Sequence, residues 1–163
     1  KLYFAASDST GRFIWRSDGT RLGSFKVTRN DVGLSAGVPH FVGDKIFFIG
    51  FDPINGQELW VSDGSAASLR RVSNITSGLQ TSHIQSLTAV GHKLYFVAAK
   101  SSTGSELWVS DGTMSGTQLV SDINTTVDAV SGLPASSFPR SLTEKNGVLF
   151  FTADDGIHGR ELW

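Results

Sequence analysis

The feature that most constrains this chain is a short motif that recurs four times. Its fullest copy, at residues 106–113, reads Glu-Leu-Trp-Val-Ser-Asp-Gly-Thr, and each copy contains one of the chain's 4 tryptophans. The tryptophans lie 45, 48 and 55 residues apart, and an apolar quartet precedes each one, at residues 1–4, 45–48, 93–96 and 148–151. A period in this range with a constant internal order is typical of repeat architectures.

The repeats define four units, the last of them partial, at residues 1–44, 45–92, 93–147 and 148–163. Residues 1–163 are therefore interpreted as a single repeat region. Residues 124–136 form the longest connection and account for the 55-residue interval. Because the fourth unit stops at its tryptophan, the chain holds about three and a third repeats. We expect it to be a segment of a longer protein or one part of an oligomer.

The composition is that of an ordinary globular chain, with 163 residues, a net charge of −1, 39% hydrophobic and 18% charged residues. The absence of a basic cluster argues against a nucleic-acid partner. No apolar run approaches the roughly 18 residues of a membrane span. Cysteine is absent, which excludes disulfides, thiolate metal sites and a cysteine nucleophile.

Each full unit predicts short strands and no helix. The expected strands are residues 1–6, 13–17, 24–28 and 39–42 in the first unit, 46–49, 59–61, 69–73 and 84–88 in the second, and 94–97, 107–109 and 118–123 in the third. Asp18-Gly19 predicts a tight hairpin, because glycine readily adopts the positive φ that such a turn needs. A short Ser/Gly/Thr loop is expected after residue 73.

Apolar residues on both sides of a strand decide the architecture. Ile46, Phe47, Phe48 and Ile49 are consecutive, so they point to both faces of their sheet. An isolated antiparallel sheet buries only one face, whereas the blades of a β-propeller are covered on both. A stacked β-solenoid is the alternative, although its rungs are usually shorter. We therefore predict an all-β fold of propeller-type blades, each with four antiparallel strands.

The repeated motif resembles the ELWxxDGT tandem repeats of large secreted or surface-associated bacterial proteins. The third unit is most similar, with Glu106-Leu107-Trp108, Ser110-Asp111-Gly112-Thr113 and Gly116-Thr117. The first unit has Phe13 in place of the glutamate, and the second has Ser65 in place of the threonine and lacks the Gly-Thr pair. The resemblance covers essentially the whole chain. It implies β-blades in an extracellular setting and brings no catalytic motif.

The regular positions of the motif have a structural and a functional interpretation. The tryptophans could pack between blades or offer faces for sugar stacking, and they are Trp15, Trp60, Trp108 and Trp163. The turn aspartates could accept hydrogen bonds in their own turns or ligate a cation, and with the glycines that follow they are Asp18, Gly19, Asp63, Gly64, Asp111 and Gly112. We favour the structural interpretation of both sets.

Candidates for ligand binding lie in the variable loops between the first and second strands. They are Asp52, Asn55, Lys100, Asp154, Asp155 and His158. Asp154 and Asp155 are candidates for Ca²⁺, which takes six to eight oxygen ligands. Lys100 in the third unit argues against a metal site in every blade, and no other cofactor is predicted. The histidines lack the spacing of a metal site or a catalytic triad.

The sequence favours a non-catalytic repeat module, extracellular or at the cell surface, that acts as a scaffold or as an adhesion and protein-interaction surface. Recognition would use the variable loops on a rigid scaffold. Expected partners are further repeats of the same chain, copies of itself, or an extracellular protein or glycan. The alternatives are a carbohydrate-binding propeller and a propeller-type enzyme, in which Arg140, His40 and Gln85 would gather at the axis.

Overall fold

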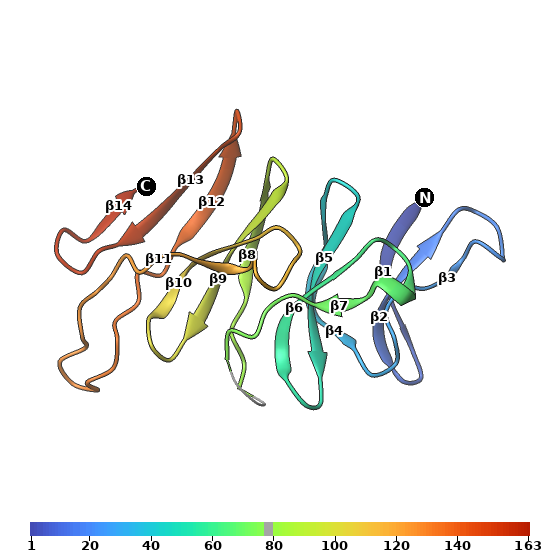
Figure 1. Cartoon of the computed structure of the whole chain (residues 1–163), viewed down its shortest axis with the longest axis horizontal. Coiled ribbons are helices and arrows are strands. Elements are labelled where there is room, and N and C mark those ends of the chain that lie inside the picture. Colours follow the sequence, from blue (N-terminus) through green and yellow to red (C-terminus); the bar gives the residue numbers. More distant parts are fainter. Residues whose placement is uncertain (77–79) are drawn as a thin grey trace. The chain divides into compact units, whose positions relative to one another are not determined.

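The structure is a computed structural model that describes residues 1–76 and 80–163, with the side chain of Ala36 left aside. The predicted Ser/Gly/Thr loop includes residues 77–79, which lie outside the described residues. The chain forms two compact units, Lys1–Thr81 (unit 1) and Ser82–Trp163 (unit 2). Each unit contains two small antiparallel sheets (Figure 1). No helix in the described part of the chain is long and apolar enough to cross a membrane.

Unit 1 contains the first and second sheets. The first sheet has the order β1-β2-β3, formed by β1 (Leu2–Asp8), β2 (Gly11–Ser17) and β3 (Phe25–Lys26). The second has the order β4-β5-β6-β7, formed by β4 (Gly33–Val42), β5 (Lys45–Asp52), β6 (Gly56–Ser62) and β7 (Arg70–Arg71). A short 3-10 helix, η1 (Ala66–Ser68), interrupts the connection from β6 to β7.

Unit 2 contains the third and fourth sheets. The third has the order β11-β10-β9-β8, formed by β8 (Gln85–Val90), β9 (Lys93–Lys100), β10 (Gly104–Ser110) and β11 (Gln118–Ser121). The fourth has the order β12-β13-β14, formed by β12 (Arg140–Lys145), β13 (Val148–Asp154) and β14 (Arg160–Leu162). The predicted all-β fold of small antiparallel sheets is therefore confirmed.

The sheets are offset by one strand from the sequence units 1–44, 45–92 and 93–147. The last strand of each unit pairs with the quartet of the next one, as β4 does with β5, β8 with β9 and β12 with β13. Each of these sheets therefore combines the last strand of one unit with the first strands of the next. Two-residue turns such as Gly43-Asp44 join these strands, and a turn that short holds the strands on either side of it together as neighbours.

Each sheet has two distinct faces. We call the face that carries the tryptophan, and the phenylalanine paired with it, the tryptophan face; the other is the opposite face. Phe4 pairs with Trp15, Phe48 with Trp60 and Phe96 with Trp108. In the fourth sheet, the backbone groups of Phe151 and Trp163 exchange two hydrogen bonds of 3.2 and 2.8 Å. These pairs define equivalent positions throughout the four repeats.

The core of unit 1 joins the tryptophan face of the second sheet to the opposite face of the first. Phe48 and Trp60 pack in one buried cluster with Ile14, and Tyr3 and Ala5 pack against it. The ring of Tyr3 lies 5.6 Å from that of Phe41. Since the two sheets meet through unlike faces, the contact has a direction, as in a head-to-tail stack.

Candidate functional site

The Ser-Asp-Gly-Thr turns are built from internal hydrogen bonds. In unit 2, Asp111 Oδ1 accepts hydrogen bonds from the nitrogen and hydroxyl of Thr113 at 2.8 and 2.7 Å, and Thr113 Oγ1 accepts one from Gly116 N at 2.9 Å. Asp18 and Thr20 make the same contacts in unit 1, at 3.0 and 2.8 Å. These hydrogen bonds lower the pKa of Asp18, those from Thr20 most. The repeated carboxylate thus has a folding role within its own turn.

The second glycine of each turn, Gly23 in the first repeat and Gly116 in the third, packs closely against the turn aspartate. A Cβ atom at Gly116 would lie 2.1 Å from Asp111 Oδ1, and one at Gly23 would lie 1.9 Å from Asp18 Oδ1. Gly19, Gly64 and Gly112 have φ values of 90, 92 and 89°, the left-handed region that favours glycine. The predicted tight hairpin at Asp18-Gly19 was wrong, because residues 18–24 form one wider turn between β2 and β3.

The second repeat has Ser65 in place of the turn threonine, and the Ser68 hydroxyl contacts the aspartate in place of the threonine hydroxyl. Ser68 Oγ donates to Asp63 Oδ1 at 2.7 Å, and Ser65 N donates to the same oxygen at 2.9 Å. These contacts lower the pKa of Asp63, with the hydrogen bond from Ser68 the strongest cause. The turn contains η1 but is as long as residues 18–24 and 111–117 in the other repeats, and its carboxylate again accepts hydrogen bonds from within the turn.

The glutamate of the Glu-Leu-Trp motif is a buried structural acceptor. Glu58 and Glu106 are both fully buried. Glu58 accepts a hydrogen bond from Ser73 Oγ at 2.5 Å, and Glu106 accepts one from Ser137 N at 2.7 Å and another from the Ser137 hydroxyl. Burial raises the pKa of Glu106, although the hydrogen bonds from Ser137 and Ile123 oppose the shift. Sequence reasoning identified the motif but not this role.

The loop between the quartet strand and the tryptophan strand of each repeat begins at equivalent positions, occupied by Asp8, Asp52, Lys100 and Asp155. Asn55 Nδ2 lies 2.9 Å from both carboxylate oxygens of Asp52. Burial works to raise the pKa of Asp52, but the hydrogen bonds from Asn55 and Ile54 outweigh it, and the pKa is lowered. The predicted pair Asp52 and Asn55 is therefore brought together as a turn.

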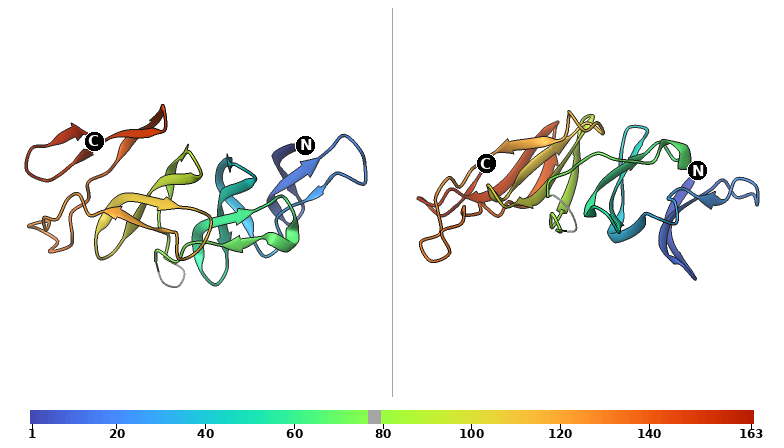
Figure 2. Two further views of the ribbon diagram at one scale, coloured as in Figure 1. Left: turned by 45° about the horizontal axis from the view of Figure 1, so that its top comes forward. Right: turned by 60° about the horizontal axis from the view of Figure 1, so that its bottom comes forward.

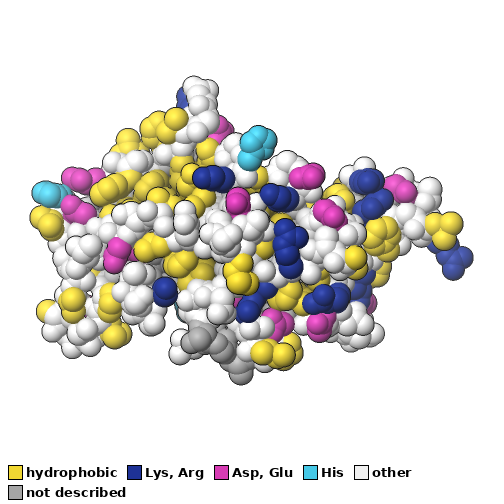
Figure 3. All heavy atoms as spheres, in the orientation of Figure 1, with side chains coloured by type: hydrophobic (Ala, Val, Ile, Leu, Met, Phe, Trp, Pro, Cys, Tyr) yellow, Lys and Arg dark blue, Asp and Glu magenta, His cyan; other side chains and the backbone are white. Residues whose placement is uncertain are grey.

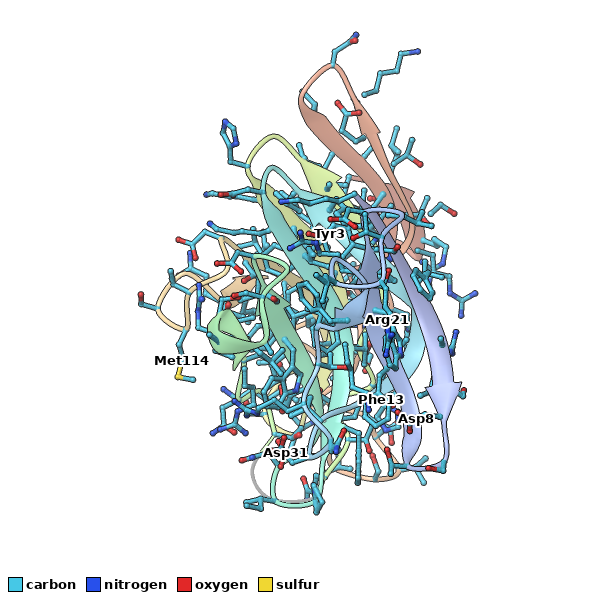
Figure 4. The ribbon with its side chains drawn as sticks, turned by 90° about the vertical axis from the view of Figure 1, so that its right-hand side faces the viewer. Tyr3, Asp8, Phe13, Arg21, Asp31 and Met114 are labelled. Carbon is cyan, nitrogen blue, oxygen red and sulfur yellow. The ribbon has the colours of Figure 1, made fainter. Side chains whose placement is uncertain are left out.

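Asp8 shows a third variant of this loop. Its Oδ2 forms an ion pair with Lys26 Nζ at 2.6 Å, and its Oδ1 accepts a hydrogen bond from Thr10 N. The ion pair with Lys26 holds the pKa of Asp8 far below its ordinary range. Lys26 Nζ also lies 3.8 Å from the centre of the Phe13 ring, and Figure 4 shows Asp8 and Phe13 close together, away from Tyr3.

The fourth loop brings both predicted calcium candidates, Asp154 and Asp155, together with a histidine. Asp154 Oδ1 accepts from Gly156 N at 2.8 Å, and Asp155 Oδ1 accepts from His158 N at 2.8 Å. His158 Nδ1 lies 2.7 Å from Asp155 Oδ2. The hydrogen bonds from His158 lower the pKa of Asp155 to about 2, and the contact with Asp155 raises the pKa of His158. Both aspartates thus serve the turn itself.

Glu161 extends this group. One ligand atom each from Asp155, His158 and Glu161 lies within 4.8 Å of the others. An imidazole with carboxylates suits zinc better than calcium, which takes six to eight oxygens. The three side chains are at least partly exposed, and Asp155 is already bonded within its turn. The cluster can hold a proton on His158, which the neighbouring carboxylate stabilises.

A small pocket in unit 1 has a volume of about 190 Å³. Asp52, Asn55 and Trp60 line it, together with Arg29 and Asp31, which sequence reasoning missed. Arg29 Nε lies 3.1 Å from Asp31 Oδ1, so these two charged side chains of the pocket are paired with each other.

The four repeated tryptophans differ in burial. Trp60 and Trp108 are almost fully buried, Trp15 is half-buried and Trp163 is exposed.

The longest connection lies between β11 and β12 in unit 2. We call residues 122–139 the long loop; it projects beyond the strands and is drawn in orange (Figure 2). Its first part is fixed by Asn124, which is buried, donates to Ser136 O at 3.3 Å and accepts from Thr126 Oγ1 at 2.6 Å. A Cβ atom at Gly156 would lie 2.5 Å from Asn124 Oδ1, so the long loop packs closely on the fourth hairpin.

The far part of the long loop has its own hydrogen bonds. Asp128 Oδ1 accepts from Ser131 N at 2.7 Å, and Asp128 N donates to Leu133 O at 2.9 Å. The hydrogen bonds from Ser131 lower the pKa of Asp128. At the base, Ser136 Oγ accepts from Ser105 N at 2.8 Å, and a Cβ at Gly104 would lie 2.3 Å from Ala135 O. The loop is therefore anchored to both neighbouring hairpins.

These contacts bring several predicted candidates into one region of unit 2. Lys100, Asp154, Asp155 and His158 lie on the two hairpins that the long loop contacts, whereas Asp52 and Asn55 lie in unit 1. We call residues 100–104, 122–139 and 154–159 the loop cluster. Its exposed large hydrophobic side chains are Val127, Val130, Leu133, Phe138 and Ile157.

The three residues considered for an enzyme axis are not all equivalent. Arg140 pairs with Thr152 and Gln85 with Val97, which are corresponding positions, but His40 pairs with Phe47 and corresponds to Thr88. Burial lowers the pKa of His40. The register shift between Gln85 and Thr88 was not visible in the sequence.

Comparison with known proteins bears on the fold. No family model matches the chain, and no curated protein matches it. Among solved structures, it is similar to a puromycin hydrolase mutant complexed with PGG, with a TM-score of 0.53 and 15% identity, over 92% of this chain and 23% of that one. At this identity the likeness concerns the fold alone, and it shows that this chain of small antiparallel sheets matches part of a propeller-containing structure.

Proposed function

We propose that the chain is a non-catalytic repeat module, extracellular or at the cell surface, whose sheets form a scaffold and whose loop cluster is a protein-interaction surface. The observation that carries this proposal is the long loop. It is fixed by its own hydrogen bonds and by both hairpins, yet Val130 at its tip is 96% exposed. Apolar side chains displayed on a rigid loop are typical of interaction sites.

The recurring polar residues support the scaffold part of this proposal. Asp18, Asp63 and Asp111 are used within their turns, and Glu58 and Glu106 are buried acceptors. Their repetition is therefore explained by folding and needs no repeated ligand. The resemblance to ELWxxDGT repeats is the reason for proposing an extracellular setting and membership of that family.

Carbohydrate binding is the alternative. A lectin-like site repeated in every blade would need the same groups in each loop, but Asp52 and Asn55 in the second sheet correspond to Lys100 and Thr103 in the third. The differing residues favour a single protein-interaction surface. The remaining alternative, a propeller-type enzyme, would need Arg140, His40 and Gln85 to meet, but the three do not all occupy corresponding positions.

The experiment compares the wild-type chain with a Val130→Ser/Leu133→Ser double variant. Binding is measured by biolayer interferometry on a panel of immobilised extracellular-matrix proteins and, separately, on a glycan array. We expect binding to at least one protein, weakened at least tenfold by the double variant. Leu22→Ser is the matched control, because Leu22 is equally exposed but lies on a turn of unit 1.

Two results would contradict the proposal. Protein binding that the double variant leaves unchanged would remove the long loop as the recognition surface. Signal on the glycan array alone would favour the carbohydrate-binding alternative.

A further inference from the structure

The quartet strands differ in burial between the inner and outer sheets. In β5 and β9, apolar residues are buried on both faces, as the consecutive pairs Phe47 and Phe48, and Phe96 and Val97, show. In β1, Leu2 is 64% and Phe4 37% exposed, and in β13, Val148 is 52% and Phe150 41% exposed. Side chains of the kind that form the core elsewhere are thus open to solvent in the first and fourth sheets (Figure 3 shows apolar side chains over β12–β14).

The two open surfaces are unlike faces of two equivalent sheets, the first and the fourth. Phe4 pairs with Trp15, so Leu2 and Phe4 lie on the tryptophan face of the first sheet. Phe151 pairs with Trp163, so Phe150 and Val148 lie on the opposite face of the fourth. One chain therefore presents one open face of each kind.

Unit 1 already contains the contact that these two faces would make. There the opposite face of the first sheet meets the tryptophan face of the second, and a Cβ atom at Gly64 would lie 2.2 Å from the Tyr3 hydroxyl. The missing side chain at Gly64 thus makes room for Tyr3. The contact between the two sheets of unit 1 thus pairs a ring on one sheet, Tyr3, with a glycine in the turn of the other, Gly64.

Both halves of that pairing occur there without a partner. Phe150 occupies the position of Tyr3, immediately before the phenylalanine paired with tryptophan, and it is exposed. Gly19 occupies the position of Gly64 in the turn after the tryptophan, and a Cβ there would meet nothing within 4 Å. The two faces are complementary by the same geometry that closes unit 1.

We infer that the tryptophan face of the first sheet binds the opposite face of the fourth sheet in a second copy of this chain. The contact is heterologous, so it propagates and gives a closed ring or an open chain of copies rather than a symmetric pair. It goes beyond the proposed function, and the long loop takes no part in it. Failure of either proposal can therefore be recognised separately.

The test measures mass by sedimentation velocity over a range of concentrations. The wild-type chain should form assemblies whose mass rises above the 17.5 kDa of one chain. Leu2→Glu and Phe150→Glu should each be monomeric, because each blocks one of the two faces. An equal mixture of these variants should form a dimer and nothing larger, because one intact face of each kind remains. Val130→Glu is the control and should associate like the wild type.

Three results would overturn the inference: a wild-type chain that stays monomeric, a single variant that still associates, or a mixture that stays monomeric. Folding of each variant is checked by circular dichroism. Leu2→Ser and Val148→Glu are the second pair, for use if either charged variant fails to fold, since both change residues that are more than half exposed.

Discussion

Glu106 accepts hydrogen bonds from both the backbone nitrogen and the hydroxyl of Ser137, so a side chain of β10 holds the segment that leads into β12. Both residues are fully buried. Ile123 N donates to the same carboxylate at 3.3 Å. One glutamate thus fixes both ends of the long loop to the third sheet, and it supports the surface on which the proposed interaction depends.

Replacing Glu106 by alanine should destabilise unit 2. The change leaves the buried donors of Ser137 and the partly buried Ile123 N without an acceptor, at roughly 1–3 kcal/mol for each unsatisfied group, so we expect a loss of about 2–4 kcal/mol. Urea denaturation followed by circular dichroism measures it. Glu161→Ala is the matched control, since Glu161 has the same place in the fourth repeat but is exposed. Equal losses of stability in the two variants would contradict the role of Glu106 as a buried hydrogen-bond acceptor for the long loop.

The raised pKa of Glu106 predicts a pH dependence of stability. Burial makes the folded state hold the Glu106 proton more tightly than the unfolded chain does. The stabilising contribution of this group is complete below its ordinary pKa of 4.5 and is lost as the pH rises through the raised value. The free energy of unfolding, measured from pH 4 to 8, should therefore fall less in Glu106→Gln than in the wild type. Parallel curves would show that Glu106 does not titrate in this way.

The repeat and its turn glycines could be predicted because they depend on local rules. Gly19, Gly64 and Gly112 adopt the positive φ expected for them. Strands were not assigned to sheets from the sequence, although the two-residue turn Gly43-Asp44 favours pairing of the strands on either side of it. Periodicity marks where strands lie but leaves open which neighbour each one joins.

The loop cluster could not be predicted, because its contacts are long-range. Glu106 and Ser137 are 31 residues apart, and nothing in the sequence near either residue indicates the other. The packing of Asn124 on Gly156 likewise joins two loops that look independent in the sequence. Variation among the loops indicated where recognition would occur, but only the fold shows which loops meet.

The Asp155–His158 pair predicts a measurable shift in histidine titration. The hydrogen bond to Asp155 raises the pKa of His158, so Asp155→Asn should lower that pKa toward its ordinary value of 6.5. NMR titration of the imidazole resonances measures this change, and His40 in unit 1 serves as the internal control. The stabilising effect of the pair on His158 is complete below pH 6.5 and is lost as the pH rises through the raised pKa. An unchanged His158 titration in the variant would show that the pair does not form in solution.

Gly116 tests why the motif has its second glycine. A Cβ atom there would overlap the Asp111 carboxylate, so Gly116→Ala should cost roughly 1–3 kcal/mol through overpacking of the turn. Gly33→Ala is the control, because its Cβ would meet only Arg12 O at an ordinary 3.8 Å. In an Asp111→Ala background the clash is absent, and Gly116→Ala should cost much less, as a double-mutant cycle of thermal unfolding would measure. Additive effects of the two changes would mean that the glycine is required for a reason other than the carboxylate.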